Sequence, residues 1–447
     1  MPVIHFILIL LLNWILLEVI IRLIAETGIE TDFYGSIRRE EVQSLQEAFG
    51  LKVVRREGRF HLGWIADPEN EHYLVQKKNL EGSWVTLEKL IYGSYLSHEG
   101  PGDYRVLSLS KITRQERSLG EVTITSETFY SEKPDQSFPV IVGEWHSLFK
   151  PSVAGNYLND HCLYRDIQGN WRIMGITSHS KGDYKLEHQF AVGVWESFPP
   201  KENFHEETPI LKGESLAWAP FVVRAEDKYH LFWSPHQLQH MTSRDGISWT
   251  NKETVMEKPF HKFFRDGMIV EITPGQWLLY ATGRGRWFSR IDLYQSFDLV
   301  HWQYIRPALS STWGSEKNFI TGSMESPFLI QRGGRYYLSV TYNNESFILS
   351  AVLLQIKIFL NRKAYNNTLI FQSQSPYDFG VYKGKTRTDS LISQLACHAP
   401  VYITLEGEWY VTTCGWPFAA TLTEGEVAYA KLNWEGINSN GRNVNKR

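Results

Sequence analysis

The segment FRDGMIVEITPGQWLLY, from Phe264 to Tyr280, contains the pattern that decides the fold. Arg265 and Asp266 precede a short apolar strand, a Pro-Gly turn follows, and Trp277 begins a second strand that is almost entirely apolar or aromatic. Glycine in such a turn supplies the tight backbone that joins antiparallel strands. A charged pair at the mouth of a buried strand costs free energy unless it is paired, hydrogen-bonded or used. The segment therefore predicts a β-hairpin that begins with functional polar groups.

The same pattern recurs along the chain. The other copies are DHCLYRDIQGNW (160–171), WAPFVVRAEDKY (218–229), ESPFLIQRGGRY (325–336) and HAPVYITLEGEW (398–409). In every copy the aromatic follows the first residue by 11 positions, and successive aromatics are 58, 48, 59 and 73 residues apart. These intervals are typical of a repeat built from one four-stranded sheet. MTSRDGISWT and YQSFDLVHWQY look like outer strands and turns of two such sheets.

The repeats predict an all-β fold, a five-bladed β-propeller over residues 140–435, with EVAYAKLNWE as its closing outer strand. In this architecture the sheets surround a central channel. We expect the first strands to line the channel, so that the first residues of the five copies converge at one end of it. Those residues are Asp160, Trp218, Asp266, Glu325 and His398. Three carboxylic acids are therefore expected at one channel mouth.

Length and charge limit the function classes. A chain of 447 residues accommodates two or three domains. Lysine and arginine total 46 against 49 acidic residues, so there is no basic field and we expect no nucleic-acid partner. Aromatic residues make up 14% of the chain, which suits stacking on sugar rings and the cores of β-proteins alike.

Residues 1–25 are predicted to be a signal peptide or a membrane anchor in the form of a hydrophobic helix. The stretch from Phe6 to Leu17 is apolar except for Asn13, which is long enough for a signal-peptide core. A wider stretch, residues 4–24, just reaches bilayer length but contains two charged residues. An unusual amphipathic helix is a third alternative. Under the first two, the protein is secreted or membrane-anchored, with its catalytic domain outside the cytoplasm.

Short alternating strands separate this segment from the repeats. Residues 26–49 are expected to form a linker and a short helix, and residues 50–135 a small β-sandwich. Within it, DPENEHYLVQKK followed by GDYRVLSLS resembles a fibronectin type III module, which implies a spacer or docking role. At the other end, the polar residues 436–447 are expected to be disordered.

One interval and the cysteines leave alternatives open. Residues 343–375 form a longer, more apolar insertion, a hairpin or a helix, with glycosylation sequons at Asn344 and Asn366. The chain has three cysteines without metal or redox spacing. Cys162 and Cys397 belong to repeats that are neighbours in a closed ring, so a disulfide or buried free thiols are both consistent with the sequence.

Three carboxylic acids at one channel mouth suit the cleavage of glycosidic bonds. This reaction needs a general acid on the leaving oxygen and a second carboxylate as base or nucleophile. Crowded carboxyl groups push each other's pKa values apart, so that one keeps its proton near neutral pH while another stays ionised. Asp160, Asp266 and Glu325 supply these groups.

The segments LNDHCLYRDIQGNW, FRDGMIVEITPGQWLLYATG, YQSFDLVHW and MESPFLIQRGGRYYL resemble the five-bladed propeller glycoside hydrolases of families 32 and 43, over about two thirds of the chain. Members of these families carry Asn-Asp-Pro, Arg-Asp-Pro, and Glu-Cys-Pro or Glu-Gly-Pro motifs. The resemblance implies that Asp160 is nucleophile or general base and Glu325 the general acid. It implies that Asp266 stabilises the transition state or tunes the acid.

The resemblance also implies substrate contacts. Arg265 would hydrogen-bond sugar hydroxyls and hold Asp266 ionised, and Trp218, in AWAP, would stack on the sugar. His398, in CHAP, would lie below the substrate, near a structural ion or water in the channel. No cofactor is required and no metal ligand is assigned. The chain departs from the family motifs because NDH and RDG lack the proline and the third motif is ESP.

These observations predict a glycosidase that acts on furanoside or pentoside glycans, such as arabinose-, xylose- or fructose-containing oligo- or polysaccharides. The alternative is a catalytically inactive carbohydrate-binding propeller. A sialidase has less support, since TSRDGISW resembles an Asp-box turn but lacks one residue of it. An interaction scaffold also has less support, because it needs no aligned acids. The sequence makes no prediction of the oligomeric state.

Overall fold

The structure is a computed structural model. It describes residues 51–56, 59–64, 70–90, 94–96, 100–125, 137–179, 184–201, 204–211, 213, 215–259, 263–284, 289–310, 323–343, 366–379, 381–382, 385–386, 391–415, 423 and 425–436. The predicted N-terminal segments 1–25 and 26–49 lie outside these residues, as does the tail after residue 436. In the described part of the chain no helix has the length and apolarity needed to cross a membrane.

Between residues 137 and 436 the described strands form five four-stranded antiparallel sheets. Sheet 1 contains β9 (Tyr157–Arg165), β10 (Trp171–Ser178), β11 (Gln189–Trp195) and β12 (His205–Ile210). Sheet 2 contains β13 (Trp218–Ala225), β14 (Lys228–Ser234), β15 (Leu238–Ser243) and β16 (Thr250–Met256). Sheet 3 contains β17 (Arg265–Thr273), β18 (Gln276–Arg284), β19 (Ser289–Ser296) and β20 (Gln303–Ser310).

In sheet 4 the strands again follow the order of the chain. In sheet 5 the outermost strand, β8, comes before all the other strands of the five sheets in the sequence. Sheet 4 contains β21 (Ser323–Arg332), β22 (Arg335–Asn343), β23 (Thr368–Ser373) and β26 (Leu391–Leu395). Sheet 5 contains β27 (Tyr402–Leu405), β28 (Glu408–Thr413), β29 (Val427–Gly436) and β8 (Ser137–Phe149). A small hairpin, β24 (Val381–Tyr382) and β25 (Lys385–Thr386), lies between β23 and β26, and a 3-10 turn, η1 (Tyr184–Leu186), precedes β11.

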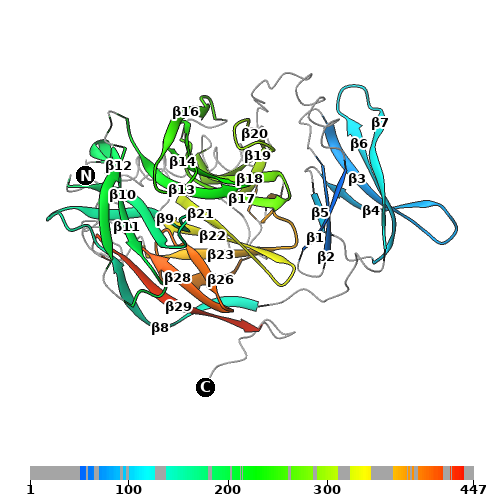
Figure 1. Ribbon diagram of the computed structural model, residues 1–447. Coiled ribbons are helices and arrows are strands. Elements are labelled where there is room, and N and C mark those ends of the chain that lie inside the picture. The colour runs from blue at the N-terminus through cyan, green and yellow to red at the C-terminus, as the bar shows by residue number, and fades with distance from the viewer. Residues whose placement is uncertain are drawn as a thin grey trace, which may run out of the picture.

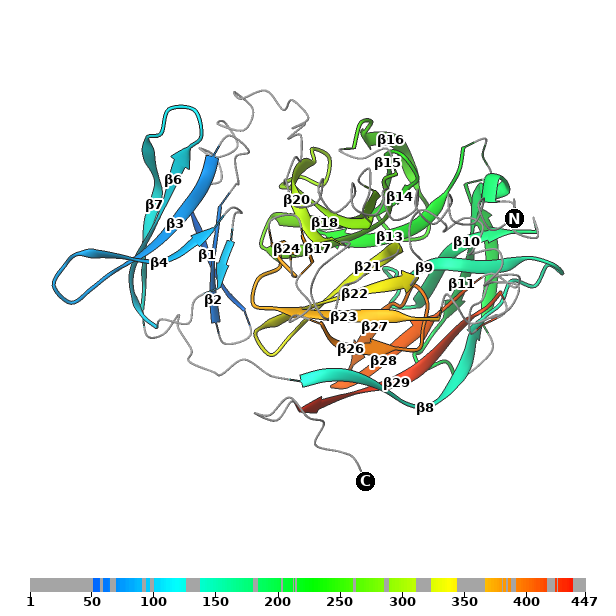
Figure 2. The same ribbon diagram turned by 180° about the vertical axis from the view of Figure 1, so that it is seen from behind.

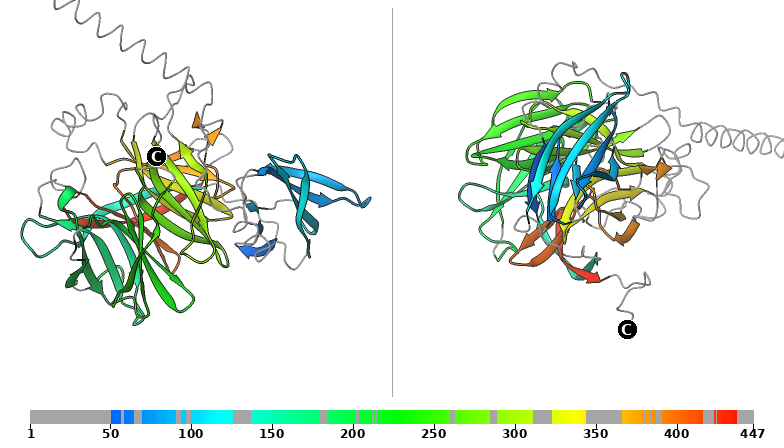
Figure 3. Two further views of the ribbon diagram at one scale, coloured as in Figure 1. Left: turned by 90° about the horizontal axis from the view of Figure 1, so that it is seen from above. Right: turned by 90° about the vertical axis from the view of Figure 1, so that its right-hand side faces the viewer.

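The five sheets form a closed ring, because each shares a hydrophobic core with the next (Figures 1 and 2). These cores contain Cys162 with Trp233 (sheets 1 and 2), Phe232 with Ile269 (sheets 2 and 3), Leu278 with Leu338 (sheets 3 and 4), Tyr337 with Val411 (sheets 4 and 5), and Leu158 with Val427 (sheets 1 and 5). Figure 3 shows the ring from two further directions. The first strands of the five sheets, β9, β13, β17, β21 and β27, are therefore brought together at the centre of the ring.

The strand that closes the ring is β8, and the prediction that EVAYAKLNWE does so is wrong. That segment is β29, the third strand of sheet 5, and β8 pairs with it as the outermost strand, from Phe149 opposite Val427 to Ser137 opposite Gly436. The strand before the first repeat is thus hydrogen-bonded to the last repeat. A period of aromatic residues does not reveal this pairing, because β8 lies outside every repeat.

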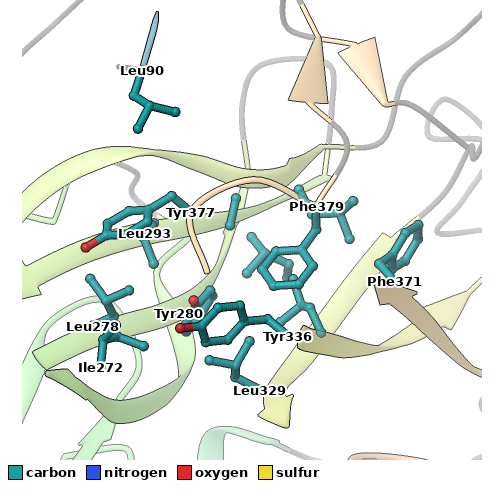
Figure 4. Close-up of a cluster of buried hydrophobic side chains, with 14 of the residues drawn as sticks. Leu90, Ile272, Leu278, Tyr280, Leu293, Leu329, Tyr336, Phe371, Tyr377 and Phe379 are labelled. Carbon is teal, nitrogen blue, oxygen red and sulfur yellow. The ribbon is translucent and has the colours of Figure 1, made fainter. Parts of the chain in front are cut away.

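The interval at 343–375 contains a regular strand of its sheet, β23, and residues 344–365 lie outside the described part of the chain. The segment after β23 packs between sheets 3 and 4, where Figure 4 shows Tyr377 and Phe379 beside Tyr280 and Tyr336. Tyr280 donates a hydrogen bond to the Pro376 carbonyl, and the backbone N–H of Phe379 donates to the carbonyl of residue 308 at 2.9 Å. The residues that directly follow the interval, 376–379, are therefore part of the core.

All three cysteines are free and buried, so the free-thiol alternative describes the structure and the disulfide between Cys162 and Cys397 does not form. Burial raises the pKa of both thiols to about 12. These thiols are therefore neutral at physiological pH.

The outer turns predicted from MTSRDGISWT and YQSFDLVHWQY are confirmed, since they join β15 to β16 and β19 to β20. In the first, Asp245 Oδ1 accepts hydrogen bonds from the backbone N–H groups of Ile247 and Ser248, both at 2.8 Å, and from the Ser243 hydroxyl at 2.7 Å. Asp298 in the second turn accepts the equivalent backbone bonds. Both turns are therefore structural.

Replacing Asp245 with alanine should lower the free energy of unfolding by roughly 1–3 kcal/mol, because two backbone N–H groups lose their acceptor. The hydrogen bonds lower the pKa of Asp245 to about 2. The stabilisation is therefore complete above the unfolded-state pKa and is lost as the pH falls toward 2. Urea unfolding at pH 7 measures the effect, with Asp227→Ala, in the exposed turn after β13, as control. Equal midpoints for the two variants would disprove this role.

The described residues from 52 to 124 form two further antiparallel sheets, which lie beside the ring in Figure 1. One has the order β1 (Lys52–Arg56), β2 (Arg59–Gly63), β5 (Ser94–Leu96). The other has the order β4 (Trp84–Leu90), β3 (Asn70–Lys78), β6 (Gly102–Ser110), β7 (Glu116–Ile124). Alternate residues of β3 and β6, including Tyr73, Val75, Tyr104 and Val106, are buried. The Tyr104 hydroxyl donates to the carbonyl of Gly100.

Candidate active site

The first strands of sheets 1 to 4 carry a bulge near their start. In β13 and β17 the pairing with the second strand shifts after the first residue, in β21 it shifts after Glu325, and in β9 it shifts between residues 159 and 161. The bulged residues Ala219, Asp266 and Ser326 have φ of 46°, 55° and 49°, and Ala399 before β27 has φ of 43°. Non-glycine residues pay roughly 1–2 kcal/mol for this left-handed conformation. Such strain gathers at functional sites.

The repeated segments predict equivalent positions for their five first residues. The bulges show that these positions differ by one residue. Asp160 and Asp266 are bulge residues, whereas Trp218, Glu325 and His398 directly precede one. The constant spacing of 11 residues between the first residue and the aromatic residue hides this difference. The reason is that the hairpins of sheets 1 and 3 have one more residue between the paired ends of their strands. Arg165 pairs with Trp171 and Glu271 with Trp277, while in sheet 4 Gln331 pairs with Tyr336.

A repeated hydrogen bond fixes Asp266, Ser326 and Ala399, in sheets 3, 4 and 5, to the preceding sheet. The backbone N–H of Asp266 donates to the Ser234 hydroxyl at 3.2 Å, that of Ser326 to Thr282 at 3.2 Å, and that of Ala399 to Thr341 at 2.8 Å. At the closure between sheets 5 and 1 the N–H of Asp160 donates to the Cys414 sulfur. These bonds hold the bulged backbone, and the acids it carries, at one end of the ring.

Asp160, Asp266 and Glu325, from sheets 1, 3 and 4, are joined through shared hydrogen-bond partners. Arg265 donates to Asp266 Oδ2 through Nε at 3.2 Å and to Glu325 Oε2 through Nη2 at 2.5 Å. Ser326 donates to Asp160 Oδ1 through its hydroxyl at 3.1 Å and to Asp266 Oδ2 through its backbone N–H at 3.3 Å. The structure therefore brings the three acids and Arg265 together, as the sequence analysis expected.

The acids differ in their surroundings. Burial, followed by the negative charges of Asp266 and Glu325, raises the pKa of Asp160 well above its usual range. Burial also raises the pKa of Asp266, although the Arg265 guanidinium opposes this and Thr282 donates to its Oδ2 at 2.9 Å. Among the described residues, Arg265 is the positively charged side chain that is hydrogen-bonded to Asp266 and Glu325. A proton shared by Asp160 and Asp266 therefore resides most stably on Asp160 in the free protein.

Glu325 has one engaged and one unused oxygen. The residue is 8% exposed, and its Oε2 is paired with Arg265, while Oε1 is buried without a partner among the described residues. A buried carboxylate oxygen without a donor costs free energy. Oε1 is therefore suited to a hydrogen bond with a bound molecule.

His398 is a buried neighbour of Glu325. It is 1% exposed, its backbone N–H donates to the Thr413 hydroxyl at 2.9 Å, and its Nδ1 lies 3.2 Å from the Cys414 carbonyl. Burial lowers the pKa of His398, and the Glu325 charge opposes this. Within the described residues no group of three or more histidine, cysteine and acidic side chains is arranged for a metal ion.

Trp218 occupies the position on β13 that Arg265 occupies on β17. Its side chain is partly buried and packs against the core between sheets 1 and 2. A partly buried ring is consistent with both roles that the sequence allows for Trp218, which are packing in the core and stacking on a sugar.

Sequence reasoning missed several residues of the cluster. Ser326 and Thr282 contact the acids directly, and Asn159 Nδ2 donates to Asp160 Oδ2 at 3.2 Å. Glu187, 2% exposed, accepts a hydrogen bond from Tyr157 at 2.5 Å and adds a negative charge near Asp160. A repeated hydroxyl on the second strand of each sheet is a signal that could have identified Thr282. Glu187 has no such signal, because it lies outside the repeated segments.

No protein-family model matches the chain. No curated protein sequence matches it either. Among solved structures, it is similar to a family 32 β-fructofuranosidase from Bombyx mori, with 15% identity, a TM-score of 0.45, and coverage of 66% of this chain and 62% of that one. The chain therefore spans less than two thirds of the Bombyx enzyme.

Two further solved structures belong to the same group of glycosidases. One is a GH43_1 enzyme from Xanthomonas citri complexed with xylose, with 12% identity, a TM-score of 0.44, and coverage of 68% of this chain and 92% of that one. The other is an exo-1,5-alpha-L-arabinanase from a bovine ruminal metagenomic library, with 13% identity, a TM-score of 0.41, and coverage of 66% and 99%. The structural neighbours are thus glycosidases of families 32 and 43.

Proposed function

We propose that this protein is a glycoside hydrolase with a five-bladed propeller, and that Asp160, Asp266 and Glu325 form its catalytic site. The observation that carries the proposal is the bonded cluster of three acids from three sheets, linked by Arg265 and Ser326. A scaffold needs no such gathering of buried acids, which costs stability. Glycosidic bond cleavage needs acids of unequal pKa.

The roles follow from the motif resemblance and the contacts. Asp160 acts as general base or nucleophile, Asp266 stabilises the positive charge of the transition state, and Glu325 donates a proton to the leaving oxygen. In the free protein Asp160 holds the proton and Arg265 pairs with Glu325. A sugar hydroxyl that takes over an Arg265 hydrogen bond would weaken this pair. Substrate binding would thereby free Glu325 to contact the leaving oxygen.

Furanoside or pentoside glycans containing arabinose, xylose or fructose are the proposed substrates, on the basis of the motifs that resemble families 32 and 43. No cofactor takes part in these proton transfers. A structural ion or water near His398 stays a proposal. Metal analysis of the purified protein, compared with His398→Ala, tests it.

A panel of aryl glycosides of arabinofuranose, xylose, fructose and galactose tests the function. We expect wild-type turnover of at least one pentoside or furanoside. Sugar binding without turnover would instead support the inactive carbohydrate-binding propeller. The specific observation that favours this alternative is the resting Arg265–Glu325 ion pair, which engages the proposed acid with a guanidinium.

Arg265→Gln should lower kcat/KM by roughly 10²-fold and move the acidic limb of its pH profile to higher pH. The guanidinium favours the ionised form of Asp266, and catalysis needs that form, so a higher pKa of Asp266 requires a higher pH. Arg265→Lys should restore part of the profile but little of the rate, because an ammonium keeps the charge and loses the fork of donors. An unchanged profile in Arg265→Gln would contradict this role.

We infer that residues 52–124 form a fibronectin type III-like module. Its support is the division into sheets β1-β2-β5 and β4-β3-β6-β7, and the hydrogen bond from Tyr104 to the carbonyl of Gly100, four residues upstream on the same chain, as in a tyrosine corner. A spacer module and an N-terminal hydrophobic segment suit an extracytoplasmic glycosidase. Fractionation of cells that express the full chain tests this location, and activity confined to the cytoplasm would oppose it.

A further inference from the structure

Ser326 is the residue at which two of the three acids meet. Its hydroxyl donates to Asp160 Oδ1 at 3.1 Å, and its backbone N–H lies 3.3 Å from Asp266 Oδ2 and 3.2 Å from the Thr282 hydroxyl. The backbone bonds depend only on the bulge, whereas the bond to Asp160 depends on the serine side chain. The hydroxyl therefore has a contact that the fold itself does not supply.

The fold does not require a hydroxyl at this position. The equivalent bulge residues Ala219 and Ala399 have φ of 46° and 43°, close to the 49° of Ser326, and carry only a methyl group. A methyl group therefore suffices at the same backbone conformation in two other sheets. The hydroxyl of Ser326 is thus not required by the bulge.

Asp160 is surrounded mainly by groups that oppose its negative charge. Asp266 on β17, Glu325 on β21 and Glu187 before β11 are acidic neighbours. The Cys414 sulfur lies beside it at the end of β28, and Arg265 bonds the other two acids. In the described part of the chain, the side-chain donors to its carboxylate are the Ser326 hydroxyl and the Asn159 amide.

We propose that Ser326 is a positioning residue that orients the Asp160 carboxylate and stabilises its ionised form for catalysis. A hydrogen bond to the charged form of a group favours that form. The contact with Ser326 opposes the rise that burial and the acidic neighbours impose on the pKa of Asp160. The inference rests on the proposed function, because it needs Asp160 to act as base or nucleophile.

Ser326→Gly tests this role without straining the backbone, since glycine accepts a positive φ. Loss of the hydroxyl should move the acidic limb of the kcat/KM profile upward by about one pH unit, the effect expected for one hydrogen bond to a charged group. Ser326→Cys should give a smaller shift in the same direction. Ala399→Gly, at the equivalent bulge of sheet 5, is the matched control and should leave the profile unchanged.

Infrared difference spectroscopy supplies a readout that does not depend on turnover. The carbonyl band of protonated Asp160, identified by its loss in Asp160→Asn, should titrate at higher pH in Ser326→Gly than in the wild type. If no glycoside is cleaved, the proposed function fails, and this titration still decides the effect of Ser326. Equal midpoints in the two proteins, or an equal shift in Ala399→Gly, would overturn the proposal.

Discussion

Replacing Asp160 with alanine should lower kcat by roughly 10²- to 10⁴-fold if Asp160 is a general base, and by up to about 10⁶-fold if it is a nucleophile. KM should change little, because the carboxylate acts on the reacting atoms rather than on remote sugar hydroxyls. Its position supports this effect. Asp160 lies on the bulge of β9, bonded to Ser326 and Asn159, and its backbone is fixed to Cys414.

Azide distinguishes the two roles, since the alanine variant leaves room for an external anion. Azide should restore part of the rate and yield a glycosyl azide, and proton NMR of the product gives its anomeric configuration. In an inverting enzyme the azide has the configuration of the wild-type product, and in a retaining enzyme the opposite one. The control is Asp227→Ala, in an exposed turn away from the cluster, with wild-type kinetics. Full activity in Asp160→Ala would refute the assignment.

Glu325→Gln should abolish turnover of glycosides with poor leaving groups, with a loss of about 10³-fold or more, and affect activated aryl glycosides far less. A general acid matters in proportion to the basicity of the leaving oxygen. Glutamine keeps an oxygen for the hydrogen bond from Arg265 and removes only the acidic proton. Substrates of graded leaving-group pKa, measured with wild type and variant, give the comparison.

A steep dependence of kcat/KM on the leaving-group pKa in Glu325→Gln supports the assignment. An equal loss for all substrates would show that Glu325 does not donate the proton. If Asp160→Ala gave the steep dependence instead, the two roles would be exchanged. The resting pair between Arg265 and Glu325 makes this exchange a real alternative.

The repeating sheets could be predicted because their signals are local. The Pro-Gly turn before Trp277 and the Ser-x-Asp turns at Asp245 and Asp298 each depend on a few consecutive residues, and the structure has turns at all three positions. Pairings that depend on distant residues could not be predicted. Strand β8 is hydrogen-bonded to a strand almost 300 residues later in the chain, and no local pattern marks it.

The candidate site shows the same division. Asp160, Arg265, Asp266 and Glu325 could be predicted from motifs at the starts of repeated strands. Their relative register could not, because the bulges and the longer hairpins of sheets 1 and 3 shift the count by one residue. Partners such as Ser326 contribute through contacts between sheets, which depend on ring closure.

A double-mutant cycle of Asp160→Ala and Glu325→Gln is the most direct test that the acids act as one site. Groups that act as a unit on one bond show strongly non-additive losses. We therefore predict that the double variant, assayed on a glycoside with a poor leaving group, is about as slow as the slower single variant. Multiplication of the two separate losses, or full activity in either single variant, would contradict a shared catalytic cluster.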